Sequence, residues 1–151
     1  MLKKALVAAV LALAVSAAAV VGAPARAASF EEGQIWRYDT RPGEENSRLF
    51  IARIDRGLGG QTIYHIYLDG LKLKNRLYEG GVQDHLPHAP VTRQALEASV
   101  TELLQSDAAM PDISEGYAVW LLAFEKGQAG VFTRPVKEIV QYIEDAFAQT
   151  K

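Results

Sequence analysis

The residues best suited to chemistry lie in the segment 84–88, which reads DHLPH and contains two of the three histidines of the chain. Two imidazoles and one carboxylate are ligands that zinc accepts, and three protein ligands leave one coordination position open for water. The prolines in and after this segment favour a polyproline-like conformation, whose period of three residues places the two imidazoles on the same side. The alternative hypothesis for this chain is therefore a small metal-binding (zinc-type) or ligand-binding periplasmic protein, centred on Asp84, His85 and His88.

The same histidines also have an ordinary structural explanation. They lie in a predicted loop just before the first predicted helix, and their spacing matches no established metal motif. The first expectation is therefore that the protein has no cofactor, with zinc as the alternative.

A second candidate surface combines basic and aromatic side chains on one face of a predicted hairpin. The dipeptide Asp69-Gly70 is a strong signal for a two-residue turn between residues 61–68 and 71–77. That turn places Leu68 opposite Leu71, so the apolar positions of both strands share one face. Basic residues on the other face suit an anionic group, although a solvated sheet face has the same alternation. The residues predicted to bind a partner there are His65, Tyr67, Lys72, Lys74 and Arg76.

No combination of residues predicts catalysis. The chain has no cysteine, which excludes a thiol nucleophile, and no Gly-x-Ser-x-Gly sequence that would indicate a serine nucleophile. The glycines at 57–60 join two predicted strands and are not followed by the helix that a phosphate-binding loop requires. We therefore expect no catalytic residue and no enzymatic activity.

The first 27 residues have the three parts of a secretory signal peptide. A positive start at residues 1–4 is followed by an Ala-rich apolar segment at 5–21 and by Ala25-Arg26-Ala27, an Ala-x-Ala cleavage site. An uncleaved membrane anchor is the alternative, but the apolar segment is at the short end of what spans a bilayer. We predict cleavage after Ala27, a periplasmic or secreted location, and no stable membrane insertion after removal of the leader.

Residues 28–151 then form one domain, since a chain of that length has no room for two. Removal of the leader takes away Lys3, Lys4 and Arg26 and no acidic residue, so the net charge changes from −2 to −5. This negative charge argues against nucleic acid and against anionic membranes as partners. Without cysteine the domain cannot form disulfides, so its stability depends on its core.

Strand-like patterns fill the first half of this domain. Alternating or continuous apolar runs predict an antiparallel β-meander of about four strands, at residues 34–40, 48–55, 61–68 and 71–77. The segment 48–55 has apolar residues on both faces, which indicates a central strand. Residues 81–90 are expected to be extended, because two prolines disfavour a helix there.

Helix-like patterns fill the second half, where apolar residues at helical spacing predict three amphipathic helices. The first is capped by Thr92 and its apolar stripe reaches Leu104. The second is capped by Ser114 and ends near Gly127, and the third has Pro135 in its first turn. Helices that follow a run of strands are typical of an α+β fold, and we expect all three to pack on one face of the sheet.

Two motifs near the start of the domain, GQIWRY at 33–38 and TRPGEE at 40–45, are similar to those of a group of small exported bacterial proteins of uncharacterised function. Similar segments at 95–103 and 116–132 extend the resemblance over most of the domain. The resemblance implies a self-contained domain, and it implies no particular activity, cofactor or site residue.

The leading hypothesis is therefore a non-enzymatic interaction domain of the cell envelope, which binds another protein or an envelope component. It depends on the export signal, on a chain long enough for a complete small fold, and on the lack of a convergent catalytic set in the sequence. The expected contact surface is the sheet face away from the helices, where the basic and aromatic residues are predicted to lie.

Overall fold

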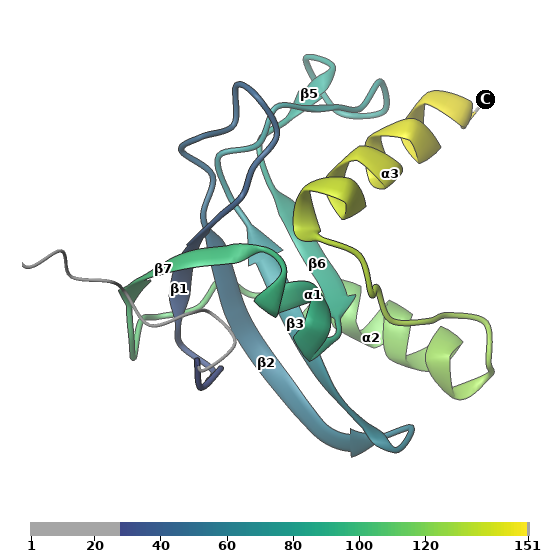
Figure 1. Cartoon of the computed structure of the whole chain (residues 1–151). Helices are drawn as coiled ribbons and strands as arrows, with labels where there is room; N and C mark the ends of the chain where they lie inside the picture. The colour runs from purple at the N-terminus through teal and green to yellow at the C-terminus, as the bar shows by residue number, and fades with distance from the viewer. Residues whose placement is uncertain (1–27, 151) are drawn as a thin grey trace, which may run out of the picture.

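The computed structural model describes residues 28–150, so the predicted signal peptide and its cleavage site lie outside the described residues. The chain has the predicted α+β fold, built on a five-stranded antiparallel sheet with the order β6-β3-β2-β1-β7 (Figure 1). Its strands are β1 (Ile35–Tyr38), β2 (Leu49–Leu58), β3 (Gln61–Leu68), β6 (Leu86–Val91) and β7 (Val100–Gln105). A separate two-stranded ribbon consists of β4 (Leu73–Lys74) and β5 (Val82–Gln83). The helices are α1 (Arg93–Glu97), α2 (Ser114–Glu125) and α3 (Val136–Gln149).

Strands β2 and β3 form the centre of the sheet, and the predicted central position of β2 is confirmed. They pair in antiparallel register from Leu49 opposite Leu68 to the residues on either side of their turn. Strand β3 is rich in β-branched and aromatic residues, which fit a pleated surface that other elements cover. The turn contains Gly59 and Gly60, both with positive φ, a conformation that glycine adopts without steric cost.

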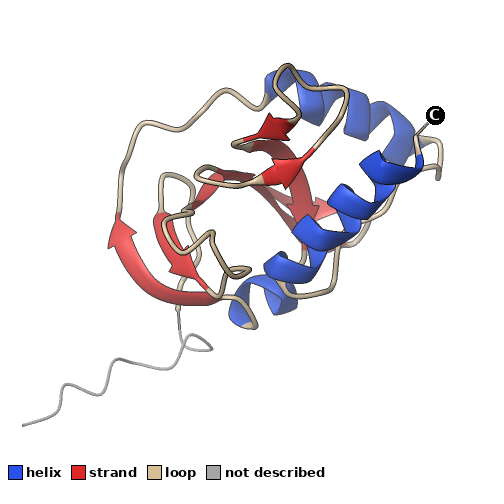
Figure 2. Cartoon of the chain, turned by 90° about the horizontal axis from the view of Figure 1, so that it is seen from above, coloured by secondary structure: helices blue, strands red, loops and turns tan. Residues whose placement is uncertain are grey.

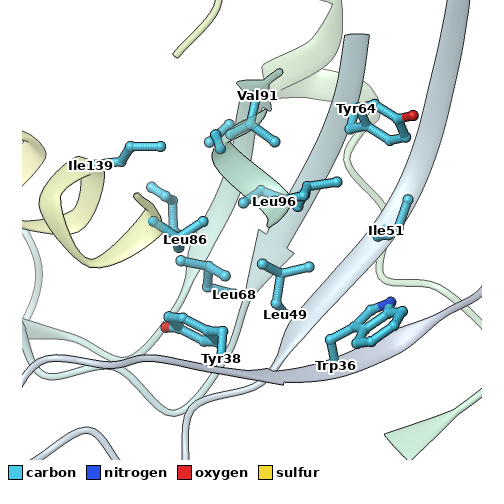
Figure 3. Close-up of a cluster of buried hydrophobic side chains, with 14 of the residues drawn as sticks. Trp36, Tyr38, Leu49, Ile51, Tyr64, Leu68, Leu86, Val91, Leu96 and Ile139 are labelled. Atoms are coloured by element: carbon cyan, nitrogen blue, oxygen red, sulfur yellow. The ribbon is translucent and has the colours of Figure 1, made fainter. Parts of the chain in front are cut away.

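The hydrophobic core lies between one face of this sheet and the helices α1 and α3 (Figure 3). Leu49, Ile51 and Leu68 of the central strands are fully buried there, in one cluster with Leu96 of α1 and Ile139 of α3. Burial of an aliphatic side chain of this size contributes about 1.5–3 kcal/mol relative to exposure. The apolar stripe that predicted α3 is confirmed, because the buried residues of this helix recur at helical spacing along one side.

The predicted hairpin at Asp69-Gly70 is wrong, because β3 pairs with β6 and not with the segment that follows it. Leu68 lies opposite Leu86, and the chain after the turn leaves the sheet to form the β4–β5 ribbon. Asp69 accepts hydrogen bonds from the backbone N–H and the guanidinium of Arg48, which hold it beside the residue that precedes β2. Strand β6 is favoured at this edge because most of its residues become buried.

The predicted helix from Thr92 to Leu104 is wrong beyond its first turns. Thr92 does cap a helix, since its hydroxyl oxygen accepts a hydrogen bond from the N–H of Ala95. That helix, α1, is short, and the chain from Val100 onward forms β7 beside β1. The pairing with β1 gives the backbone groups of both segments hydrogen-bond partners, and this tertiary contact overrides the helical spacing of the apolar residues. The sheet therefore has two strands, β6 and β7, that the predicted four-stranded meander lacks, and β7 curves along the side of the molecule opposite α3 (Figure 2).

Helix α2 packs on the opposite face of the sheet from α1 and α3, which corrects the prediction that all three helices share one face. Adjacent residues of a strand point to opposite faces, so Ile66 enters the core while His65 faces α2. The ring of His65 packs against Tyr117 and Trp120 of α2, at a centroid distance of 4.9 Å in each case. The apolar residues of α2 lie on both its buried and its exposed sides, so no single stripe determines which surface it covers.

The bounds predicted for the last two helices are close to those observed. Ser114 is the first residue of α2 and not its cap, and its N–H donates to Oδ1 of Asp112. Pro135 immediately precedes α3 and does not lie inside its first turn. Within residues 28–150, no helix has the length and apolar character needed to cross a membrane.

Candidate functional site

The sheet brings two histidines that are distant in sequence into contact beneath α2. His65 is in β3 and His88 is in β6, and the pairing of these strands places both side chains on the face that α2 covers. Their rings are nearly parallel, with centroids 5.1 Å apart and planes at 14°. Nδ1 of His65 lies 2.9 Å from Nε2 of His88, which is a hydrogen-bonding distance. His65 has an exposed fraction of 0%, whereas His88 is only partly buried.

Asp55 of β2 lies on the far side of His65 from His88. Its Oδ2 is 3.1 Å from Nε2 of His65 and accepts a hydrogen bond of 2.7 Å from the hydroxyl of Tyr117. Its Oδ1 accepts a hydrogen bond of 2.8 Å from Nε of Arg53, whose guanidinium also lies over the ring of Tyr117. Burial acts to raise the pKa of Asp55, but the hydrogen bonds from Tyr117 and Arg53 outweigh it and lower this pKa. Asp55 is therefore ionised at neutral pH, and we call Asp55, His65 and His88 the histidine chain.

Both imidazoles of the histidine chain are neutral at neutral pH. Burial lowers the pKa of His65, although the carboxylate of Asp55 acts in the opposite direction. Burial, together with the nearby His65, lowers the pKa of His88 to about 4. A neutral imidazole has one donor and one acceptor nitrogen, so the hydrogen bonds of the chain define the tautomer of each ring.

The carboxylate of Asp55 determines the direction of these hydrogen bonds. Because an ionised carboxylate only accepts, His65 must carry its proton on Nε2 and present a lone pair at Nδ1. His88 must then donate from Nε2 to that lone pair, which leaves Nδ1 of His88 without a proton. The histidine chain therefore ends in a hydrogen-bond acceptor, Nδ1 of His88.

His88 lines a groove of about 680 Å³ that runs along α2, and we call it the α2 groove. Among the described residues, every buried side-chain nitrogen and oxygen has a hydrogen-bond partner. Nδ1 of His88 takes part in no side-chain hydrogen bond of this part of the chain, so this atom is not completely buried. The residue that forms the open end of the histidine chain is therefore also one that lines the α2 groove. Other residues that line the groove are Asp112, Ile113, Glu115, Val119 and Ala123.

Two residues of α2, Gly116 and Trp120, allow the helix to pack close to His88. A Cβ atom at Gly116 would lie 2.7 Å from Cβ of His88, closer than real Cβ atoms approach, so only glycine permits this packing. Trp120 donates a hydrogen bond of 2.9 Å from its indole Nε1 to the carbonyl oxygen of Gly130. Its ring packs against His65 and lies 6.1 Å from the ring of His88. These contacts place the wall of the α2 groove beside the open end of the histidine chain.

A second polar network joins the turn after β1 to the β4–β5 ribbon and α3. Arg41 donates to both carboxylate oxygens of Glu44, at 2.9 and 2.6 Å, and to Glu144 of α3 at 3.3 Å. The backbone N–H of Lys72 donates to Glu44, and that of Lys74 donates to Glu144. We call Arg41, Glu44 and Glu144 the Arg41 network.

The residues predicted to form one binding surface lie in separate places. His65 is buried beneath α2, and Tyr67 stacks on His85 with ring centroids 5.7 Å apart. Their predicted common face with the basic residues is not formed, because the segment after residue 70 does not pair with β3. The basic residues line cavities beside α3 instead, and these are Lys72, Lys74 and Arg76.

The residues of the predicted zinc site are not brought together as one ligand set. Oδ1 of Asp84 lies 2.8 Å from Nδ1 of His85, so these two side chains pair with each other. His88 belongs to the histidine chain and contacts His65. Within residues 28–150, no group of three or more histidine, aspartate or glutamate side chains is arranged to hold a metal ion.

Sequence reasoning missed Asp55, Tyr117 and Trp120. Asp55 lies at the end of a predicted strand, and the two aromatic residues occupy apolar positions of a predicted helix. One local signal was present, because Arg53 and Asp55 are a charged pair with the two-residue spacing of one strand face. Nothing local connects Asp55 to His88, since only the pairing of three strands brings them together.

Comparisons of the chain with models of protein families, with curated proteins and with solved structures give no match. No family, activity or partner is therefore carried over to this chain from a relative. Any function proposed for it depends on the α2 groove and the histidine chain themselves.

Proposed function

We propose that this protein is an exported, non-catalytic binding domain that recognises another protein or a cell-envelope component at the α2 groove. The observation that carries this proposal is the unpaired acceptor at Nδ1 of His88, a residue that lines the groove and ends a partly buried and otherwise fully paired chain. Apolar grooves with a few fixed polar groups are typical of binding sites, because the polar groups orient what the apolar walls hold.

The chemistry of the groove supports binding more than catalysis. With a pKa of about 4, His88 is a weak base at neutral pH, whereas a general base works best when its pKa is near the operating pH. Among the described residues that line the α2 groove, none has a hydroxyl or thiol group for His88 to activate. The groove therefore supplies a shape and a hydrogen-bond acceptor, which are properties of a recognition site.

Exposed apolar side chains on α2 add to the contact surface. Val119 lines the groove and has an exposed fraction of 68%, and Leu122 follows it along the helix with 60%. Exposed large apolar residues beside a concave site are typical of interaction surfaces. We therefore propose the α2 groove as the contact surface, in place of the basic residues that lie beside α3.

A photo-crosslinking amino acid at Val119 tests this proposal in living cells. We expect a crosslinked species of defined mass, and we expect the His88→Gln substitution to reduce its yield. The matched control is the same crosslinker at Val82 of β5, an exposed valine (50%) that does not line the α2 groove. Equal crosslinking at the two positions would contradict a specific site at the groove.

Export is tested separately by cell fractionation and N-terminal sequencing. We expect the protein in the periplasm or the medium, with an N-terminus after Ala27. Recovery in the cytoplasm with residues 1–27 intact would contradict export and leave the test of the groove unaffected.

A further inference from the structure

We propose that Asp55, acting through His65 and His88, makes the α2 groove selective for a ligand that carries a primary ammonium group on an apolar body. A small amine and the side chain of a lysine share this chemistry. The inference rests on the proposed function, because it names the class of ligand for the same site.

The need for a donor on the ligand follows from the direction of the hydrogen bonds. Asp55 accepts from His65, His65 accepts from His88, and so Nδ1 of His88 presents a lone pair. A ligand group with an N–H satisfies this lone pair. A ligand group that only accepts would place two lone pairs face to face, which disfavours its binding.

The preference for a positive charge follows from the other polar groups of the groove. Asp112 and Glu115 line it, and no lysine or arginine is among its described lining residues. The ring of Trp120 is also part of the wall, and cations are attracted to an indole face. The start of α2 has the opposite polarity, but Asp112 accepts the N–H of Ser114 and Glu115 lies in the first turn, which offsets it.

The preference for an apolar body follows from the remaining wall residues. Ile113, Val119, Ala123 and Ala129 line the groove and bear no charge. Contact with them removes apolar surface of the ligand from water. A primary amine with an aliphatic chain therefore matches the acceptor, the charge and the walls together.

The substitution Asp55→Asn is expected to reverse the polarity of the groove. Arg53 only donates, so it keeps the amide oxygen in the place of Oδ1 and turns the amide nitrogen toward His65 and Tyr117. That nitrogen donates to Nε2 of His65, whose proton must then move to Nδ1. His65 now donates to Nε2 of His88, and Nδ1 of His88 becomes a donor.

The first part of the test measures the tautomers by long-range proton–nitrogen NMR of the histidine side chains at neutral pH. We expect protons on Nε2 of His65 and His88 in the native protein, and on Nδ1 of both in the Asp55→Asn variant. Native amide dispersion in the variant shows that it is folded. Protonation of His88 at Nδ1 in the native protein would overturn the proposal, whatever binds in the groove.

The second part measures binding of four probes with the same six-carbon chain, by amide shifts at Gly116 and Val119 and by the indole resonance of Trp120. The probes are hexylammonium, hexyltrimethylammonium, 1-hexanol and hexanoate. Hexylammonium has a positive charge and N–H donors, hexyltrimethylammonium has the charge without a donor, and hexanol has a donor without the charge. Hexanoate is negative and only accepts. We expect hexylammonium to bind best, with hexyltrimethylammonium and hexanol about tenfold weaker and hexanoate weakest, as for a lost hydrogen bond to a charged group.

In the Asp55→Asn variant we expect hexanoate to bind better than it does to the native protein, and hexylammonium to bind about tenfold more weakly. The His88→Gln variant serves if the first one does not fold, because glutamine can still donate to His65 but lacks an acceptor at the position of Nδ1. It should lose the preference for hexylammonium over hexyltrimethylammonium.

Equal affinity for all four probes, or no binding of hexylammonium, would overturn the inferred ligand class. Neither result would contradict the proposed function, which is judged by crosslinking at Val119 against Val82. Equal crosslinking at Val119 and Val82, together with the expected order of probe affinities, would contradict the proposed function. It would not contradict the inferred ligand class.

Discussion

The Arg41 network and the histidine chain are built from similar side chains, but they differ in whether each polar group has a partner within the protein. Each is a set of charged and polar side chains that strands and a helix bring together. In the Arg41 network, Glu44 has an exposed fraction of 3%, and both of its carboxylate oxygens accept from Arg41. The histidine chain is paired at each step until Nδ1 of His88, and His88 lines the α2 groove.

This difference separates a structural role from a recognition role. The groups of the Arg41 network form hydrogen bonds with one another and so fix the positions of the elements they join. These elements are the turn after β1, the β4–β5 ribbon and α3. The histidine chain leaves one hydrogen-bond acceptor unpaired at a groove, and a ligand can bind to that acceptor. Substitutions in the Arg41 network should therefore change stability, and substitutions in the histidine chain should also change binding.

The largest effect is expected for Glu44→Ala. Removal of this buried carboxylate leaves part of the Arg41 guanidinium and the N–H of Lys72 without their acceptor. We expect the free energy of unfolding to fall by about 3 kcal/mol, as for other broken buried pairs, measured by urea denaturation. Binding of hexylammonium to the folded variant should be unchanged, and a parallel loss of binding would show that the two networks are not separate.

Acidification should weaken the histidine chain by a smaller amount. The pKa of His88 is about 4 in the folded protein, and an unperturbed histidine has a pKa near 6.5. Between these values the unfolded chain binds more protons than the folded one, so stability is complete above pH 6.5 and is lost as the pH falls to 4. Because His88 is only partly buried, solvent screens part of this effect, and we expect a loss on the order of 2 kcal/mol over this range, measured by denaturation at several pH values.

The control for this pH dependence is the His88→Gln variant. Its stability should depend less steeply on pH between 6.5 and 4, because one of the two histidines with a lowered pKa is gone. An identical slope in the variant would mean that folding does not lower the pKa of His88.

Gly116→Ala should damage the α2 groove. The added Cβ would lie 2.7 Å from Cβ of His88, so α2 must move away from β6. We expect a loss of about 1–2 kcal/mol in stability, typical of overpacking, and weaker hexylammonium binding. The matched control is Gly130→Ala, where no atom lies within 4 Å of the added group, and where both measurements should stay close to those of the native protein.

The smallest effect is expected for Lys74→Ala. Only the backbone N–H of this residue donates to Glu144, and the substitution keeps that group. We expect a change in stability within about 0.5 kcal/mol, the range of ordinary surface substitutions, measured by thermal or urea unfolding. A loss well above 1 kcal/mol would mean that the Lys74 side chain is itself part of the Arg41 network.

Three features that depend on residues close together in the sequence were predicted correctly. The cap at Thr92, the apolar stripe of α3 and the central position of β2 follow from local hydrogen bonding and from side-chain period, and all three are confirmed. The extended character of residues 82–83 and 86–91 follows in the same way from prolines that disfavour a helix.

Where two distant segments compete for one position, local patterns were insufficient. The signal at Asp69-Gly70 predicts a hairpin, but β6, most of whose residues are buried, pairs with that edge of β3 instead. Residues from Val100 have helical spacing, but the edge of β1 requires a hydrogen-bonding strand. In both cases a long-range partner contributes more free energy than the local preference.

The sequence by itself therefore determined an α+β domain without disulfides, its central strand and its last helix, because these depend on composition and on the period of apolar residues. Only the tertiary structure decided which face α2 covers and which residues meet beneath it. Asp55, His65 and His88 are far apart in the chain, and no local pattern relates them. Their hydrogen bonds exist because β2, β3 and β6 pair side by side and expose one row of polar residues to α2.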